Sequence, residues 1–117
     1  MKTIEIISIP VTNQEKSKQF YEDLGFALIA EAPFGNGQTW IQLGFPGHDA
    51  SITLVTWFPK MPPGSHQGFV VKTDSLDQDV EELTAKGIEV GKIDETPWGR
   101  FATVADPDGN TVSFHQW

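Results

Sequence analysis

The sequence predicts an α+β domain made of two β-α-β-β-β modules. Three observations support this fold class. The C-terminal stretch has the pattern of a β-hairpin, two short amphipathic segments that each end at a glycine predict helices, and the order of elements repeats after roughly sixty residues. Neither half is large enough to bury both its helix and its sheet, so the two modules must share a core.

The hairpin occupies residues 101–117, FATVADPDGNTVSFHQW. Proline presets one turn dihedral, and glycine and asparagine tolerate the left-handed conformations of a tight reversal, so DPDGN predicts the turn. Side chains alternate across a strand, which places Val112 and Phe114 on one face and Ser113 and His115 on the other. We expect the first face to pack on a helix and the second to line a pocket or meet solvent.

The first module begins with an Ile-rich strand at 3–11, in which Pro10 indicates an edge position. Thr12 or Asn13 can cap the following helix, and Gly25 is placed to end it. Turn-forming residues then separate the predicted strands 26–32, 39–43 and 51–57.

A linker rich in proline and glycine, at about 58–68, precedes the second module. Its first strand is predicted at 69–71, and Asp74 or Ser75 can cap a helix that ends at Gly87. A strand at 88–93 and the hairpin complete the repeat. The expected module bounds within the single domain 1–117 are 1–60 and 64–117.

The composition excludes several classes of protein. With 117 residues, 38% of them hydrophobic, the chain suits one globular domain. A net charge of -8 argues against a nucleic-acid partner and favours cations. Cysteine is absent, which rules out disulfides and thiol chemistry. No signal-peptide layout or membrane-spanning run is present, so we expect no membrane partner and a cytoplasmic protein.

The sequence resembles the vicinal oxygen chelate superfamily, which includes glyoxalase I, extradiol dioxygenases and bleomycin resistance proteins. The resemblance lies in Val11-x-Asn13 leading into FYEDLGF at 20–26, in the helix that ends at Gly87, and in the DPDGN turn. It implies that the sheets of the two modules curl into a half-open barrel around a cavity. A fold of this kind hosts many functions, so the resemblance indicates the fold better than the reaction.

Metal-dependent members of this superfamily place four ligands on the first and last strands of the two modules. By resemblance, the corresponding positions here are Ile6, Thr53 (to within one residue), His66 and Ser113. Isoleucine has no lone pair, and the two hydroxyls are weak neutral ligands. We therefore expect no metal and no other cofactor at the family position.

A rearranged metal site is the alternative. His115 follows Ser113 by two residues, so it lies on the same strand face and could approach His66 inside the cavity. With a carboxylate, two histidines could bind iron or zinc and support a divalent-metal-dependent lyase, isomerase or dioxygenase. No carboxylate is evidently placed for this role, and whether the protein is an enzyme stays open. No catalytic residue is predicted.

The preferred hypothesis is a metal-free protein that binds a small aromatic or amphipathic molecule. The aromatic side chains favour a cavity that stacks flat ligands, and the acidic field favours cationic ones. Bleomycin resistance proteins are, by the family resemblance, acidic metal-free dimers, so we expect a homodimer here. The residues predicted to line the ligand site are Trp40, Gln42, Thr53, His66, Ser113 and His115.

Overall fold

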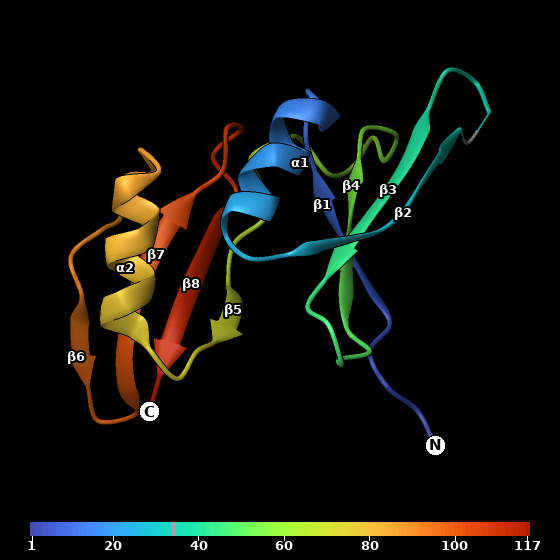
Figure 1. The fold of residues 1–117 in the computed structure, drawn as a ribbon. Coiled ribbons are helices and arrows are strands. Elements are labelled where there is room, and N and C mark those ends of the chain that lie inside the picture. The colour runs from blue at the N-terminus through green and yellow to red at the C-terminus, as the bar shows by residue number, and fades with distance from the viewer. Residues whose placement is uncertain (34) are drawn as a thin grey trace.

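Two four-stranded mixed sheets, each accompanied by one helix, form the computed structural model, which describes residues 1–33 and 35–117 (Figure 1). Each sheet is drawn from one half of the chain, as the predicted repeat requires. Neither sheet closes on itself, in keeping with the predicted α+β class and a half-open barrel-like fold.

The first sheet has the strand order β1-β4-β3-β2. β1 pairs in parallel with β4, from Ile6 opposite Ser51 to Pro10 opposite Val55, and the other pairs are antiparallel. The edge position predicted for Pro10 is therefore confirmed. The elements are β1 (Ile6–Pro10), α1 (Gln14–Asp23), β2 (Ala27–Pro33), β3 (Thr39–Gly44) and β4 (Ser51–Val55).

The second sheet repeats this plan with the order β5-β8-β7-β6. β5 pairs in parallel with β8, and β7 pairs with β8 as the predicted hairpin, with Ala105 opposite Thr111 next to the DPDGN turn. The elements are β5 (Phe69–Lys72), α2 (Leu76–Ala85), β6 (Asp94–Thr96), β7 (Gly99–Ala105) and β8 (Thr111–Gln116).

The prediction of a strand at 88–93 is wrong. The chain runs there without strand pairing, apart from a single backbone hydrogen bond from Gly91 to Thr103, and the edge strand is β6, further along. Sequence periodicity detected the apolar residues Ile88, Val90 and Ile93, which pack against the core from an irregular segment. Burial of this kind does not require a hydrogen-bonded ladder.

The structure shows which of the two predicted residues caps each helix. Asn13 is the cap of α1, and its side-chain oxygen accepts a hydrogen bond from the Lys16 amide at 3.0 Å. Thr12 instead donates its hydroxyl to Asp108 at 2.6 Å, which is a contact with the other module. Ser75 is the N-cap of α2, without a side-chain hydrogen bond to the helix.

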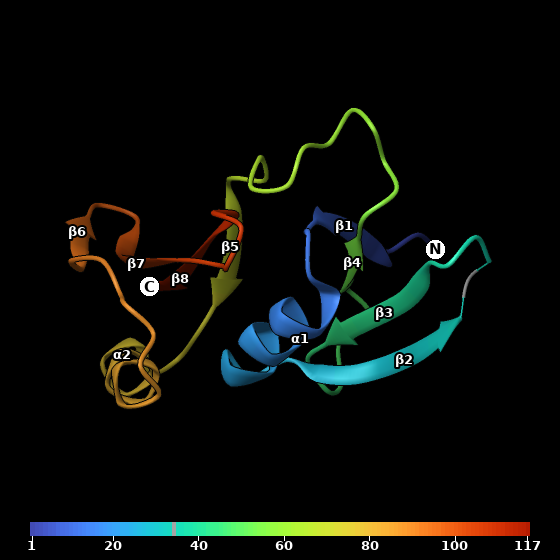
Figure 2. The same ribbon diagram turned by 90° about the horizontal axis from the view of Figure 1, so that it is seen from above.

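The core lies on the helix-facing side of each sheet. Ile41, Leu43, Ile52 and Leu54 are fully buried on the side where α1 packs on β3 and β4, and Phe114 is buried beneath α2. Figures 1 and 2 show that α1 lies between the two sheets. The face of the first sheet that is opposite α1 therefore points away from the second module.

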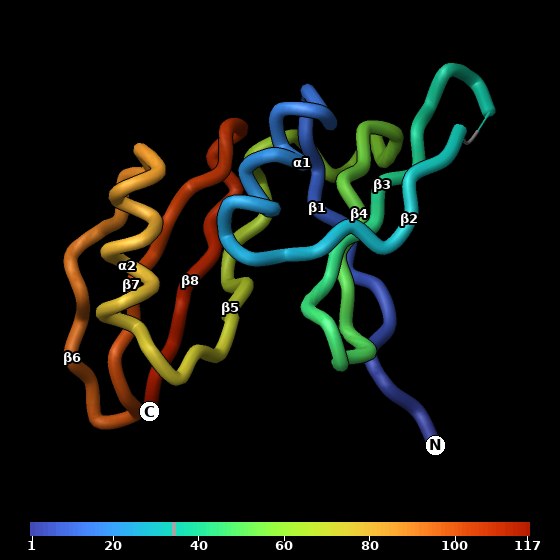
Figure 3. The backbone as a smooth tube through the Cα atoms, viewed as in Figure 1, coloured from blue at the N-terminus to red at the C-terminus, as the bar shows by residue number. Residues whose placement is uncertain are grey.

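The chain passes from β4 to β5 through a long irregular segment that arches beside the two modules (Figure 2). Both chain ends leave the molecule on the same side, below the sheets in the view of Figure 3. No helix within residues 1–33 and 35–117 is long and apolar enough to span a membrane.

Candidate functional site

Three of the predicted site residues gather on the outer face of the first sheet, opposite α1. Gln42 on β3 lies directly across from Thr53 on β4, and Trp40 shares the face because it is two residues from Gln42. The Trp40 indole N–H donates to Gln42 Oε1 at 3.2 Å, and Gln42 Nε2 donates to Ser51 Oγ at 2.8 Å. These contacts fix the orientation of the Gln42 amide.

The neighbouring strand β1 supplies the rest of this outer face. Ile6 lies opposite Ser51, and Ser8 lies opposite Thr53 with their hydroxyl oxygens 3.3 Å apart. Thr53 is buried and Ile6 is 37% exposed. The face thus combines hydroxyl and amide groups with an aromatic and an aliphatic side chain, and Ile6 adds no metal donor.

The outer face of the second sheet carries Ser113 and His115, as the alternation predicts. The Ser113 hydroxyl lies 2.7 Å from the Thr103 hydroxyl on β7. His115 is buried, stacks on Phe101 with ring centroids 4.4 Å apart, and meets the Trp117 ring edge-on at 4.7 Å.

The hydrogen bond of His115 restricts what its ring can do. Nε2 lies 2.7 Å from the backbone carbonyl oxygen of Trp98, and because a carbonyl only accepts, Nε2 carries the proton. This nitrogen is therefore not available to a metal. The ring belongs to an aromatic cluster with Phe101 and Trp117, and Trp117 is 76% exposed. Trp98 contributes its backbone carbonyl to this cluster.

Sequence reasoning missed Phe101, whose ring is in this cluster, and Trp98, whose backbone carbonyl bonds to His115. The signal for Phe101 was present, because counting back from the DPDGN turn places it directly opposite His115. Trp98 had no such signal. It precedes β7 in the β6–β7 turn, and only the hydrogen bond of its carbonyl to His115 brings it to the site.

His66 lies apart from the other predicted residues. Its amide donates to Asn110 Oδ1 at 3.0 Å, its carbonyl accepts from the Thr111 amide at 3.0 Å, and its ring meets Phe69 edge-on at 6.1 Å. Phe69 belongs to the core face of β5. Gly68, with φ +83, interrupts the strand alternation that would have placed His66 on the face of Ser113.

The surroundings of the His66 ring favour its neutral form. Nδ1 is buried and has no hydrogen-bond partner within residues 1–33 and 35–117. Burial lowers the pKa of the His66 imidazole below its ordinary value, and the attraction of the Asp106 carboxylate offsets only part of this effect.

Within a single copy of the protein, His66 and His115 lie apart. His66 bonds to Thr111 at the start of β8, and His115 lies four residues further along, about 13 Å at the strand rise of about 3.3 Å per residue. Within residues 1–33 and 35–117, no three His, Cys, Asp or Glu side chains are grouped as a metal site requires. The rearranged metal site is thus not assembled by a single copy.

The DPDGN turn joins the two modules. Asp106 Oδ1 accepts the amides of Asp108 and Asn110, both at 2.9 Å, and Oδ2 accepts the Tyr21 hydroxyl at 3.0 Å. The Asn110 amide group donates to the Pro10 carbonyl at 2.7 Å. Burial, followed by the charge of Asp106, raises the pKa of the Tyr21 phenol, which stays protonated as a donor. These contacts give the motif a structural role.

A cavity of about 600 Å³ lies elsewhere, between the two modules on the helix-facing side of their sheets. None of the six predicted residues lines it. Its walls are mainly aromatic and aliphatic side chains from both modules, including Phe26, Phe45, Phe69 and Val71.

Comparisons with known proteins agree with this architecture. A family model described as the Glyoxalase/Bleomycin resistance protein/Dioxygenase superfamily matches residues 3–114. The protein YetH of Bacillus subtilis (strain 168) is 29% identical over 116 residues, which cover 94% of each chain.

Two solved structures from Streptomyces sp. CB03234 are 44% identical to this chain. TnmS3, described as an antibiotic binding protein, has a TM-score of 0.94, and the match covers 99% of this chain and 96% of TnmS3. A glyoxalase/bleomycin resistance protein has a TM-score of 0.87, with 97% of this chain and all of that chain covered.

Proposed function

Because the chain belongs to the Glyoxalase/Bleomycin resistance protein/Dioxygenase superfamily, we propose that it is a metal-free cytoplasmic protein that binds a small aromatic or amphipathic molecule between two copies of itself. The proposal rests on the polar and aromatic side chains that lie on the outer faces of the two sheets. One holds the Trp40–Gln42–Thr53 group, and the other holds Ser113 beside the His115 aromatic cluster.

Each outer face forms only one wall of a site. Because α1 lies between the sheets, the outer face of the first sheet points away from the second module of the same chain (Figures 1 and 2). Exposed apolar side chains border both faces, with Ile6 at 37%, Val70 at 49% and Trp117 at 76% exposure. A second copy that places its second sheet over the first sheet of its partner would cover these residues and enclose a ligand.

The chemistry of the two walls fits a flat ligand with a few polar groups. Trp40 would stack on a ring, and Gln42, Thr53 and Ser113 would provide hydrogen bonds. His115 would present its aromatic cluster from the partner. His66 is left out of this proposed wall, because its ring packs on Phe69. The likeness to TnmS3, an antibiotic binding protein, supports small-molecule binding as the activity.

The metal-free part of the proposal depends on the donors present. Ile6 offers none, and the hydroxyls of Thr53 and Ser113 are weak ligands that already lie within 3.3 Å and 2.7 Å of neighbouring hydroxyls. Nε2 of His115 is held by a carbonyl. Within residues 1–33 and 35–117, no three His, Asp or Glu side chains are grouped as a metal site requires.

Elemental analysis tests the metal-free state. Protein purified without chelator should contain well under one zinc, iron, nickel or manganese per chain. A near-equimolar metal that is lost in His66→Ala and kept in His48→Ala would overturn this part of the proposal. It would favour a divalent-metal-dependent lyase, isomerase or dioxygenase with a site completed by the partner.

Calorimetric titration with flat aromatic cations, neutral molecules and anions of equal size tests the binding site. Cations should bind best because the chain carries a net charge of -8, and the preference should weaken as salt rises. Trp40→Phe should weaken the best binder by about 0.5–2 kcal/mol, the typical contribution of ring stacking and cation–π contact. Glu81→Gln, on the exposed surface of α2, is the control. Equal binding by wild type and Trp40→Phe would refute the proposed stacking wall.

A further inference from the structure

We propose a second small-molecule site on each chain, in the cavity between the two modules, which accepts a flat, uncharged aromatic ring system. This site is separate from the proposed cleft between copies, and neither proposal depends on the other. The cavity has a volume of about 600 Å³, within the range of about 300–1,000 Å³ that is usual for ligand pockets.

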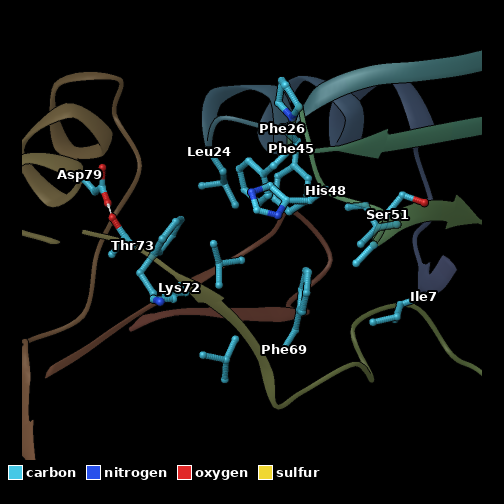
Figure 4. A pocket seen from close by; sticks show the side chains of 16 residues that line it. Ile7, Leu24, Phe26, Phe45, His48, Ser51, Phe69, Lys72, Thr73 and Asp79 are labelled. Atoms are coloured by element: carbon cyan, nitrogen blue, oxygen red, sulfur yellow. Dashed lines mark hydrogen bonds between the residues drawn. The ribbon is translucent and has the colours of Figure 1, made fainter. Parts of the chain in front are cut away.

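Both modules contribute to the walls, as the close view in Figure 4 shows. The lining side chains are predominantly apolar, and they come from β1, the segment after α1, the β3–β4 region, β5 and the residue after it, α2 and β8. The apolar lining residues include Phe26, Phe45, Ile52, Phe69, Val71 and Phe114.

The aromatic rings give the cavity its preference for a flat ligand. Phe26 and Phe45 lie 4.3 Å apart between centroids with their planes at 33°, and Phe26 and Phe69 lie 6.3 Å apart with their planes at 44°. Phe26 is buried, whereas Phe45 and Phe69 are only partly buried and present ring surface to the cavity. A planar apolar ring packed against the cavity side of Phe45 and Phe69 would bury apolar surface and make offset or edge contacts with these phenyl groups.

The charged groups of the cavity favour an uncharged ligand. Asp79 accepts a hydrogen bond from the Thr73 hydroxyl, which Figure 4 draws as a dashed line. Lys72 and His48 are exposed, so their polar ends remain hydrated at the mouth. A charge on a ring that packs against the phenyl and aliphatic walls would lose its hydration, which is unfavourable.

This cavity is distinct from the stacking wall of the proposed cleft. Trp40, Gln42 and Thr53 lie on the face of the first sheet that is opposite α1, whereas the cavity is lined by Ile52 from the α1-facing side. Ser51 and Val70 border both sites, because they line the cavity while Ser51 also accepts a hydrogen bond from Gln42 and Val70 lies opposite Ser113. Trp40 does not line the cavity, so a variant at Trp40 should leave the cavity site unchanged.

The probe for the experiment is N-phenyl-naphthylamine, a flat uncharged molecule whose emission rises in apolar surroundings. Wild-type protein should bind it saturably, with one probe per chain. Ala50→Trp places a large side chain at the cavity mouth, because Ala50 is exposed and lines the cavity, and should weaken binding by at least about tenfold. Asp49→Trp is the matched control, since Asp49 is exposed and does not line the cavity, and its affinity should stay within about twofold of wild type.

Pro46→Trp, at the same mouth, repeats the test if Ala50→Trp does not fold, and circular dichroism verifies the fold of each variant. Trp40→Phe should leave probe binding unchanged. Absence of saturable binding, full binding by both mouth variants, or a loss in Trp40→Phe would each overturn the second site. The last result would place the probe in the cleft between copies and leave the proposed function intact.

Discussion

At the scale of the single residue, His66 is placed by its backbone rather than by strand alternation. Its amide and carbonyl are both bonded to the segment that starts β8, and Gly68 turns the chain before β5 begins. The ring consequently packs on Phe69, with Nδ1 buried and unbonded within residues 1–33 and 35–117. Burial of this ring lowers its pKa, so the fold favours the neutral form of His66.

The pH dependence of stability should report on this histidine. Burial lowers the pKa of His66 in the folded chain below its ordinary value of 6.5, so the unfolded chain takes up a proton first as pH falls. The stabilising contribution is complete above pH 6.5 and is lost as pH decreases from there to the folded pKa. Urea unfolding across this range should show a decline in the free energy of unfolding that is smaller in His66→Gln.

The control for this prediction is His48→Gln, which removes an exposed imidazole and leaves the His66 ring in place. Its pH profile should keep the decline seen in wild type. Identical profiles for wild type and His66→Gln would show that the buried ring does not govern stability in this range.

At the scale of the element, the β7–β8 turn and helix α1 form the junction of the two modules. Tyr21 is fully buried on α1 and donates to Asp106, whose carboxylate also organises its own turn through the amides of Asp108 and Asn110. Asn110 continues the chain of contacts to Pro10 at the end of β1. The motif residues that indicated the family are thus the residues that hold the halves together.

Tyr21→Phe should destabilise the protein by about 1–3 kcal/mol, because it leaves a buried carboxylate oxygen with one donor fewer while the ring packing is kept. Phe20 and Phe26 contact the Tyr21 ring edge-on and would still do so. Chemical denaturation measures the effect, and Gln19→Ala on the exposed side of α1 is the control. A Tyr21→Phe variant as stable as wild type would mean that water replaces the lost donor at Asp106.

At the scale of the whole molecule, the outer faces of the two sheets carry the groups suited to a ligand and have exposed apolar borders. Enclosing a ligand with both faces requires a second copy, because the helix-facing sides and α1 occupy the space between the sheets (Figure 2). The proposed homodimer follows from this arrangement.

Light scattering at micromolar concentration should give about twice the chain mass of 12.9 kDa. Ile6→Glu adds a charge to the outer face of the first sheet, on the edge strand β1, and should shift the protein toward monomer and weaken ligand binding together. Thr84→Glu adds the same charge to the exposed surface of α2 and should leave the mass unchanged. A wild-type monomer would refute the proposed cleft between copies.

The sequence by itself determined most of the elements, though not the edge strand β6, and much of each face. Glycines and caps indicated the helices, and the DPDGN turn fixed the β7–β8 register closely enough to place Ser113 and His115 on one face and Val112 and Phe114 on the other. The same two-residue period places Trp40 and Gln42 on one face of β3, and the pairing of β3 with β4 puts Thr53 opposite Gln42. These features follow from local dihedral preferences and from the two-residue period of a strand, which operate within a few residues.

Only the tertiary structure decided where those faces point. Thr12 bonds to Asp108 rather than capping α1, the apolar segment 88–93 packs without becoming a strand, and the His66 ring meets Phe69 edge-on. The position of α1 between the sheets separates the two outer faces and creates the cavity between the modules. Each of these outcomes depends on contacts between residues distant in the chain, whose geometry is set by the packing of the two modules and leaves no local pattern in the sequence.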